Sequence, residues 1–298
     1  MMLSILLPSY ENTCLALVRQ LAEQASLIPS LEYEIIVVED GGTNDATKAA
    51  DQGISSIPNC HYLPQNRNRG RAAVRNFLAS VARGEWLLFL DSDVTLPAND
   101  FLSRYVSILR SHQNETLAMD GGVTVIGNPR QMRHNLRFRY EHKAQERLCA
   151  KARAKHPYQC IRTTNLLVSR GIMRQEGFDE RFTGYGYEDV LFGKRLQMAN
   201  IPVIHADIPV GLDKWDSNLR YVEKTEEALR TLYQFRTELD GFSPLLDICK
   251  SIERHHLTPF VKLWHRIIGP MEKANLTSRH PSLLVYKLYK VGYYLSLV

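Results

Sequence analysis

The sequence lacks any uninterrupted apolar stretch that approaches the about 18 residues of a membrane-spanning helix. Its N-terminal apolar residues soon meet Pro8 and a polar run, so the start of the chain does not resemble a signal peptide. The five cysteines are scattered, and no C-x-x-C pair suggests a zinc ribbon or a redox motif. We therefore expect a cytoplasmic protein with reduced thiols.

Internal repeats and low-complexity segments are also absent. The apolar share of 44% and the charged share of 23% are those of a folded globular protein rather than a disordered or fibrous one. A chain of 298 residues is long enough for one large α/β domain with a short appendage.

Positive charge is concentrated near the C-terminus. The net charge is +5, and residues 241–298 alone carry eight Lys or Arg against three Asp or Glu. A second basic stretch runs from Arg130 to Lys155. Such stretches favour phosphates or lipid headgroups, although a solvated helix face is the simpler alternative. We do not expect nucleic-acid binding, because no aromatic residues interleave with the arginines of residues 66–76.

Short apolar runs alternate with helical patterns in the first half of the chain. The periodicity predicts strands at 3–7, 34–38, 61–63 and 86–90, with helices at 13–27, 43–52 and 72–82. Because each parallel strand needs a crossover to its neighbour, this order predicts a Rossmann-like doubly wound sheet. The second half is less regular, with strands predicted at 118–125, 164–168 and 203–205 and helices at 132–154, 188–198 and 219–239.

Polar loops follow three of the predicted strands, at residues 8–11, 39–42 and 91–93. Ligands of doubly wound sheets bind at this carboxyl edge. The carboxylates of Asp91 and Asp93 are hard oxygen ligands that suit Mg²⁺ or Mn²⁺ on a diphosphate, although acidic turns after strands are common. Residues 39–45 suit contacts to a base or ribose, or else a turn with a helix cap from Thr43 or Asn44.

Four segments, LPSYEN, VVEDGGTND, NRNRGRAAVRN and FLDSD, occur in order over roughly residues 1–100. Together they resemble the nucleotide-sugar-binding half of glycosyltransferase family 2. The segment Gly184 to Asp189, GYGYED, is similar to the G-x-G-x-E-D acceptor-site segment of that family and of galactosyltransferase-like enzymes. The resemblance implies an α/β GT-A fold, a Rossmann-like mixed sheet with helices on both faces, plus a helical C-terminal extension.

The resemblance also implies a domain organisation and a function. A catalytic domain at 1–240 would combine a nucleotide-sugar-binding half (1–115) with an acceptor-binding half (116–240), followed by a basic amphipathic helical tail (241–298). An inverting, metal-dependent transfer from a UDP-sugar to a saccharide or lipid-linked glycan is expected, in polysaccharide biosynthesis. One alternative is an inactive sugar-nucleotide-binding protein. Another is a nucleotidyltransferase, although LPSYENT is not the glycine-rich, lysine-bearing loop expected of one.

Residue roles follow from the same resemblance. Asp189 is the expected general base, beside Glu188, and the alternative is an acidic first helical turn. Asp93 is the expected ligand of Mn²⁺ or Mg²⁺. His205 is a candidate second ligand or else a buried strand histidine, and Asp213 is a possible substitute. The donor-binding residues are expected to be Pro8, Tyr10, Glu11, Asp40, Asn68, Gly70, Arg71, Arg75, Asp91 and Ser92. The acceptor-binding residues are expected to be Gly184, Tyr185, Gly186 and Tyr187.

The tail presents apolar residues at helical spacing, among them Phe260, Leu263, Trp264 and Ile267, next to several cations. One interpretation is peripheral association with the inner face of the cytoplasmic membrane. The other is packing on the catalytic domain or formation of a homodimer. The sequence leaves these open.

Overall fold

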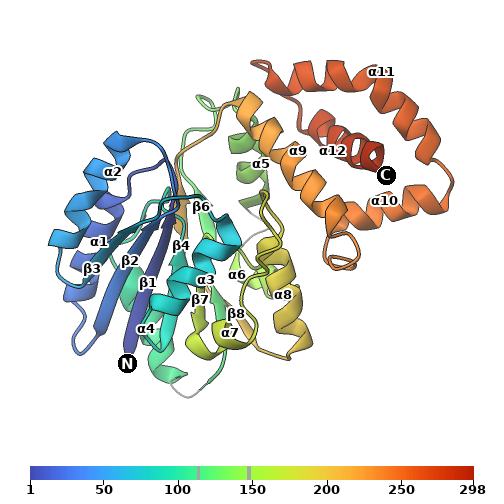
Figure 1. Ribbon diagram of the computed structural model, residues 1–298. Coiled ribbons are helices and arrows are strands. Elements are labelled where there is room, and N and C mark those ends of the chain that lie inside the picture. The colour runs from blue at the N-terminus through green and yellow to red at the C-terminus, as the bar shows by residue number, and fades with distance from the viewer. Residues whose placement is uncertain (113–114, 146–148) are drawn as a thin grey trace.

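A computed structural model describes residues 1–112, 115–145 and 149–298 (Figure 1). Its centre is a seven-stranded sheet in the order β3-β2-β1-β4-β7-β5-β8. The strands are β1 (Met2–Ser9), β2 (Glu32–Glu39), β3 (Cys60–Pro64), β4 (Trp86–Leu90), β5 (Ala118–Asp120), β7 (Asn165–Ser169) and β8 (Val203–His205). A small second sheet pairs β6 (Val123–Val125) with β9 (Val210–Leu212).

The first four strands are parallel, as the alternation of strands and helices predicts. β7 runs antiparallel to both β4 and β5, while β8 is parallel to β5. The sheet is therefore mixed, as the family resemblance implies. Because β7 lies next to β4 in this orientation, residues just before β7 meet the loop that follows β4.

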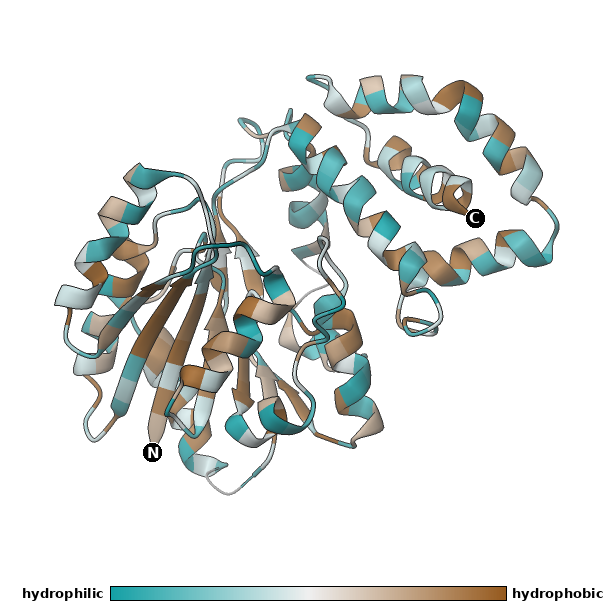
Figure 2. Ribbon diagram, in the orientation of Figure 1, coloured by the Kyte–Doolittle hydropathy of each residue, from teal (hydrophilic) through white to brown (hydrophobic). Residues whose placement is uncertain are grey.

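Helices cover both faces of this sheet. Leu3, Ile5 and Leu7 of β1 point into a core with α1 (Leu15–Ser26) and α4 (Phe101–Ser111). Leu6 points to the opposite face, which packs against α3 (Arg71–Val81), α7 (Arg170–Gln175) and α8 (Glu188–Met198). This alternation follows from the two-residue period of a strand, and Figure 2 shows the central strands as predominantly hydrophobic.

Several boundaries differ from the sequence prediction. Predicted strand 118–125 is two strands, because Gly122 adopts φ +84° and redirects the chain between β5 and β6. Predicted helix 132–154 is described as α5 (Leu136–Gln145) and α6 (Ala150–Arg153), and residues 146–148 of that prediction lie outside the described residues. The helices α2 (Asp45–Gln52), α3 and α8 lie close to where the periodicity places them, whereas α4, α7 and β9 were not predicted.

The C-terminal part is helical, as expected, with α9 (Asn218–Gln234), α10 (Pro244–Arg254), α11 (Thr258–Thr277) and α12 (Leu283–Leu297). These helices form a group beside the sheet domain (Figure 1). α12 packs against α9, where the Tyr286 and Thr225 hydroxyls lie 2.9 Å apart and the Tyr289 hydroxyl donates to Glu226 at 2.6 Å. In the part of the chain that the structure describes, no helix is long and apolar enough to cross a membrane.

Candidate active site

A cavity of about 610 Å³ lies at the carboxyl ends of β1, β2 and β4. All three polar loops singled out in the sequence contribute to it, and residues 183–189 and α9 contribute from the second half of the chain. The expected site residues that line it are Pro8, Tyr10, Asp40, Asn68, Gly70, Arg71, Arg75, Asp91, Ser92, Asp93, Gly184, Tyr185, Gly186, Glu188 and Asp189. The fold therefore brings together side chains as far apart in the sequence as Pro8 and Asp189.

The loop after β1 is fixed by a buried carboxylate from outside the site. Asp51 accepts hydrogen bonds from the Thr13 hydroxyl at 2.7 Å and from the Cys14 and Leu15 backbone N–H groups at 3.1 Å each. These N–H groups open α1 and have no partner inside that helix. Satisfying them anchors the loop from Pro8 that forms one wall of the cavity.

Asp40 joins the loop after β2 to the loop that precedes α3. Its carboxylate accepts from the backbone N–H groups of Arg69, at 2.9 Å, and Gly70, at 3.1 Å. Burial raises the pKa of Asp40, and these two amides oppose that effect. A Cβ at Gly41 would lie 2.1 Å from the Arg67 carbonyl carbon, so this close approach of the two loops requires glycine. The expected contact of Asp40 with a nucleobase stays a prediction.

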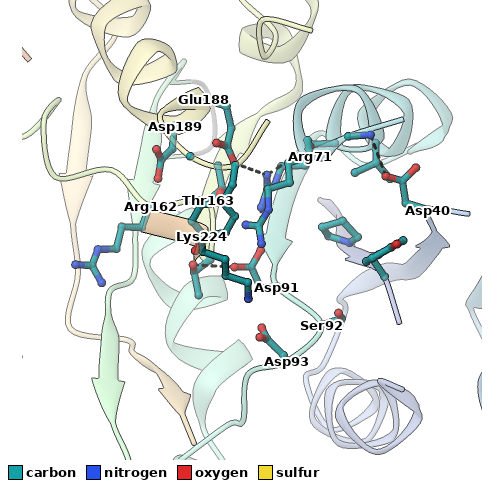
Figure 3. Close-up of a pocket in the computed structure, with 18 of the residues that line it drawn as sticks. Asp40, Arg71, Asp91, Ser92, Asp93, Arg162, Thr163, Glu188, Asp189 and Lys224 are labelled. Carbon is teal, nitrogen blue, oxygen red and sulfur yellow. Dashed lines mark hydrogen bonds and ion pairs between the residues drawn. The ribbon is translucent and has the colours of Figure 1, made fainter. Parts of the chain in front are cut away.

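Arg75 is the centre of a buried ion-pair network, and its two carboxylate partners, Asp91 and Glu188, are labelled in Figure 3. Only 1% of this side chain is exposed, and it donates to Asp91 at 2.9 Å and to Glu188 at 3.1 Å. The second carboxylate oxygen of Asp91 accepts from the Thr164 hydroxyl at 2.9 Å. Arg75 therefore holds the carboxylates of Asp91 and Glu188 in place from within the protein. We expected its guanidinium near the donor, but these two ion pairs already engage it.

The two carboxylates that follow β4 are in different electrostatic states. Burial alone would raise the pKa of Asp91, but Arg75, Arg71 and the Thr164 hydroxyl together hold it below its ordinary value. Burial and the negative charge of Asp91 raise the pKa of Asp93. Asp91 is thus engaged by the protein, whereas the charge on Asp93 is poorly compensated by its surroundings.

A strained turn places Glu188 and Asp189 at the start of α8. Gly186 adopts φ +88° and Tyr187 adopts φ +71°, a conformation uncommon for a residue with a side chain. Burial, together with the charge of Glu188, raises the pKa of Asp189 to about 7. A carboxyl group with that pKa can both take up and release a proton near neutral pH.

Cations from the second half of the chain complete the cavity. Arg137 and Lys224 both contact Asp216, at 3.0 and 2.9 Å, and Arg162 contacts Glu141 at 3.4 Å.

Sequence reasoning did not select Arg162, Thr164 or Lys224 as site residues. The pairing of β7 with β4 would have indicated Thr164, but no motif surrounds Lys224.

Two of the expected donor and acceptor residues lie beside the cavity rather than in its lining. Glu11, at φ +54°, accepts from the Thr43 backbone N–H and hydroxyl, and so connects the loops after β1 and β2. Tyr187 packs against the hydrophobic cluster that α9 forms with the C-terminal helices. Asn44, rather than Thr43, caps α2 through its side-chain oxygen.

The structure does not place His205 at the cavity. Its ring is fully buried, with Nε2 2.9 Å from the Pro157 carbonyl oxygen and Nδ1 3.2 Å from Arg153 Nε. Both nitrogens therefore have protein partners, as in the alternative interpretation of a buried strand histidine, and the ring lies outside the cavity lining. Asp213 does not line the cavity either. Within residues 1–112, 115–145 and 149–298, no cluster of three or more His, Cys, Asp or Glu side chains is arranged to hold a metal ion.

Residues 4–172 match the family model described as glycosyl transferase family 2. Among curated proteins, the chain is 27% identical over 256 residues to a validoxylamine A glucosyltransferase of Streptomyces hygroscopicus, covering 76% of this chain and 57% of that protein. It is 29% identical over 136 residues to a poly(ribitol-phosphate) beta-glucosyltransferase of Bacillus spizizenii, covering 44% and 21% respectively. The matches thus span less than two thirds of either relative's length.

Two solved structures are similar over almost the whole chain. One is S. aureus TarS 1–349, with a TM-score of 0.54 and 16% identity over 100% of this chain and 90% of that one. The other is the mannosyltransferase PcManGT of Pyrobaculum calidifontis, with a TM-score of 0.58 and 15% identity over 98% and 84%. At these identities the likeness shows a shared GT-A fold.

Proposed function

The chain belongs to glycosyl transferase family 2, and from this premise we propose that it transfers a sugar from a nucleoside diphosphate donor to a saccharide or lipid-linked glycan, with inversion. The observation that carries the proposal is that Asp93 and Asp189 line one cavity. In Figure 3 they lie on either side of Asp91. A donor diphosphate at Asp93 and an acceptor hydroxyl at Asp189 therefore fit within the same space.

The donor would occupy the side formed by the loops after β1, β2 and β4. Asp40, Asn68 and Gly70 line this side, and the Arg71 guanidinium lies 4.6 Å from the Tyr185 ring. We favour a uridine donor. TarS 1–349 has been solved with UDP and with UDP-GlcNAc, which supports this choice, whereas PcManGT was solved with GDP-Man.

A divalent cation fits the residues present. The Asp93 carboxylate has a raised pKa because it is buried near the negative charge of Asp91, and a dication would relieve that repulsion. Mg²⁺ commonly uses one or two protein carboxylates and takes its other ligands from phosphates and water, so a cluster of three protein ligands is not required. The complex of PcManGT with Mn²⁺ supports this assignment. When bound, such an ion supplies Lewis-acid stabilisation of the departing diphosphate.

Asp189 would remove the proton from the attacking acceptor hydroxyl. General-base assistance is most effective when the pKa of the base lies near the working pH, and that of Asp189 is about 7. Glu188 Oε2 is buried and has no hydrogen-bond partner among the described residues, and its negative charge lies beside the proposed base. Arg75 would hold this pair in place through Glu188.

The acceptor would bind between α5, the segment 162–164 and α9. We propose that the acceptor carries a phosphate group that lies at this place. Arg137 and Lys224 share the carboxylate of Asp216, so two cations that line the cavity lie on one side chain and could also contact a phosphate. The name of the poly(ribitol-phosphate) relative supports a phosphate-bearing acceptor. Lys224→Met should raise the KM for such an acceptor without changing protection by the donor.

Protection against thermal unfolding tests the donor assignment. UDP- and GDP-sugars are titrated with and without Mn²⁺, and ligand binding to the folded state raises Tm by mass action. A Tm increase with one UDP-sugar that requires metal is expected, and no increase with any nucleotide sugar would contradict the proposal. Slow donor hydrolysis that depends on Mn²⁺ would distinguish an enzyme from an inactive sugar-nucleotide-binding protein.

A further inference from the structure

An exposed apolar stripe runs along α11, at the end of the molecule away from the β2–β3 edge of the sheet (Figure 1). We define it as the α11 apolar face, and its exposed fractions range from 55% for Trp264 to 71% for Phe260. The intervals of three, one, three and four residues keep its five members on one side of the helix. They are Phe260, Leu263, Trp264, Ile267 and Met271.

The opposite side of α11 is the one that packs against the protein. Leu276 joins a buried cluster with Tyr286 and Tyr289 of α12, and His265 lies close to Gly292. Glu272 is buried on that side as well. An amphipathic helix normally turns its more apolar side inward, whereas α11 turns Gly269, Glu272 and His265 inward beside Leu276 and leaves five large apolar residues outward. Such an exposed patch marks an interaction surface.

The exposed charges of α11 and α12 are of one sign. Glu272 is the only acidic residue in α11 and it is buried, and α12 contains no acidic residue. Arg266 is exposed on the flank of the stripe, and Arg279 is exposed just after α11. Just before α11, Arg254 is exposed beside the exposed Glu253, so that end carries no net charge. The partner that complements an apolar stripe flanked by cations has an apolar interior and an anionic surface.

We propose that the α11 apolar face lies on an anionic lipid bilayer, with its large side chains at the boundary between headgroups and acyl chains. A helix with large apolar residues on one side and cations beside them is the type that lies in this interface plane. A second copy of this chain is the poorer match. A stable interface buries about 800 Å² per partner, and two such faces would bring arginines together without exposed acidic residues of α11 or α12 to pair with them. The inference does not depend on which sugar is transferred.

Vesicle co-sedimentation of the full chain tests the proposal. We compare vesicles of phosphatidylcholine alone with vesicles containing phosphatidylglycerol, and we compare wild type with the double variant Phe260→Ser/Ile267→Ser. The matched control is Met198→Ser/Leu219→Ser, which removes two other exposed apolar side chains outside the tail. All four side chains are exposed, so unchanged thermal unfolding is expected for both variants. We expect binding to the anionic vesicles that weakens with salt, falls at least tenfold in the α11 variant and is unchanged in the control.

Tryptophan emission reports insertion independently. Trp86 is 3% exposed and Trp215 is half-buried, so Trp264 is the tryptophan that a bilayer would newly surround. A blue shift on adding anionic vesicles is expected in wild type and not in Trp264→Phe.

The proposal is overturned if wild type does not bind the vesicles or if the α11 variant binds as wild type does. It is also overturned if ultracentrifugation without lipid shows a dimer that only the α11 variant dissociates.

Discussion

Arg75 Nη1 lies 3.1 Å from Glu188 Oε1, and this ion pair joins two segments that are 113 residues apart in the sequence. The same guanidinium holds Asp91 at 2.9 Å. Arg75 therefore links the loop after β4, in the first half of the chain, to the start of α8, in the second half. Because Asp189 is the next residue after Glu188, the position of the proposed base depends on this buried contact.

Removing the guanidinium should destabilise the fold. Arg75→Met leaves Asp91 and Glu188 without their cation, and breaking a buried ion pair typically costs about 3–5 kcal/mol. Urea unfolding followed by circular dichroism measures the change in the free energy of unfolding. Lys250→Ala, which removes an exposed pair with Asp240, is the control and should change it little. Equal stability of Arg75→Met and wild type would show that the network is not structural.

Asp189→Asn should separate binding from turnover. The amide keeps the shape of the side chain but cannot accept a proton, so turnover should fall by about 10²–10⁴. The increase in Tm caused by the donor and Mn²⁺ should persist, because Asp189 is not placed at the diphosphate. Activity close to that of wild type would remove Asp189 from the role of base.

Turnover should rise with pH across neutrality. Burial, with the charge of Glu188, raises the pKa of Asp189 to about 7, and only the deprotonated carboxylate can act as a base. The rate should therefore be low near pH 6, rise through about pH 7 and level off above about pH 8. Glu188→Gln removes the neighbouring negative charge, so the pKa of Asp189 should fall and the rate should rise at a lower pH. A rate that does not change between about pH 6 and about pH 8, or that rises at a higher pH in the variant, would contradict the assignment of Asp189 as the base.

Asp93→Asn should weaken the effect of metal on donor binding. A neutral amide is a poorer ligand for Mn²⁺ or Mg²⁺ than a carboxylate. We expect donor protection in the variant to be smaller and nearly independent of added Mn²⁺, and chelation by EDTA should reduce protection of the wild type to a similar level. Ser92→Ala, at the neighbouring position, is a control that keeps both carboxylates. Undiminished metal dependence in Asp93→Asn would exclude Asp93 as the ligand.

The first half of the chain was predictable because its polar loops directly follow strands of clear periodicity. Parallel strands bring the ends of β1, β2 and β4 to one edge, so the proximity of Pro8, Asp40 and Asp91 follows from strand order alone. Even there, the sequence did not reveal how the side chains are used. Arg75 was expected near the donor, but its partner Glu188 is distant in the sequence, and only the fold shows that the guanidinium is buried.

The second half was less predictable because its strands are short and pair in mixed directions. The sequence indicated a strand near 164–168 but not that it runs antiparallel to β4, and this orientation is what places Thr164 against Asp91. His205 was a candidate ligand because of its position relative to the family pattern. The structure pairs both of its nitrogens within the protein, which periodicity could not indicate.

The stereochemistry of donor hydrolysis tests the central claim most directly. With Mn²⁺ and the nucleotide sugar that protects best against unfolding, water replaces the acceptor, and proton NMR identifies the first sugar anomer released before mutarotation. In-line attack assisted by Asp189 predicts that this anomer has the configuration opposite to that of the donor, and that Asp189→Asn forms it far more slowly. Release of a sugar with the donor's own configuration would contradict the account.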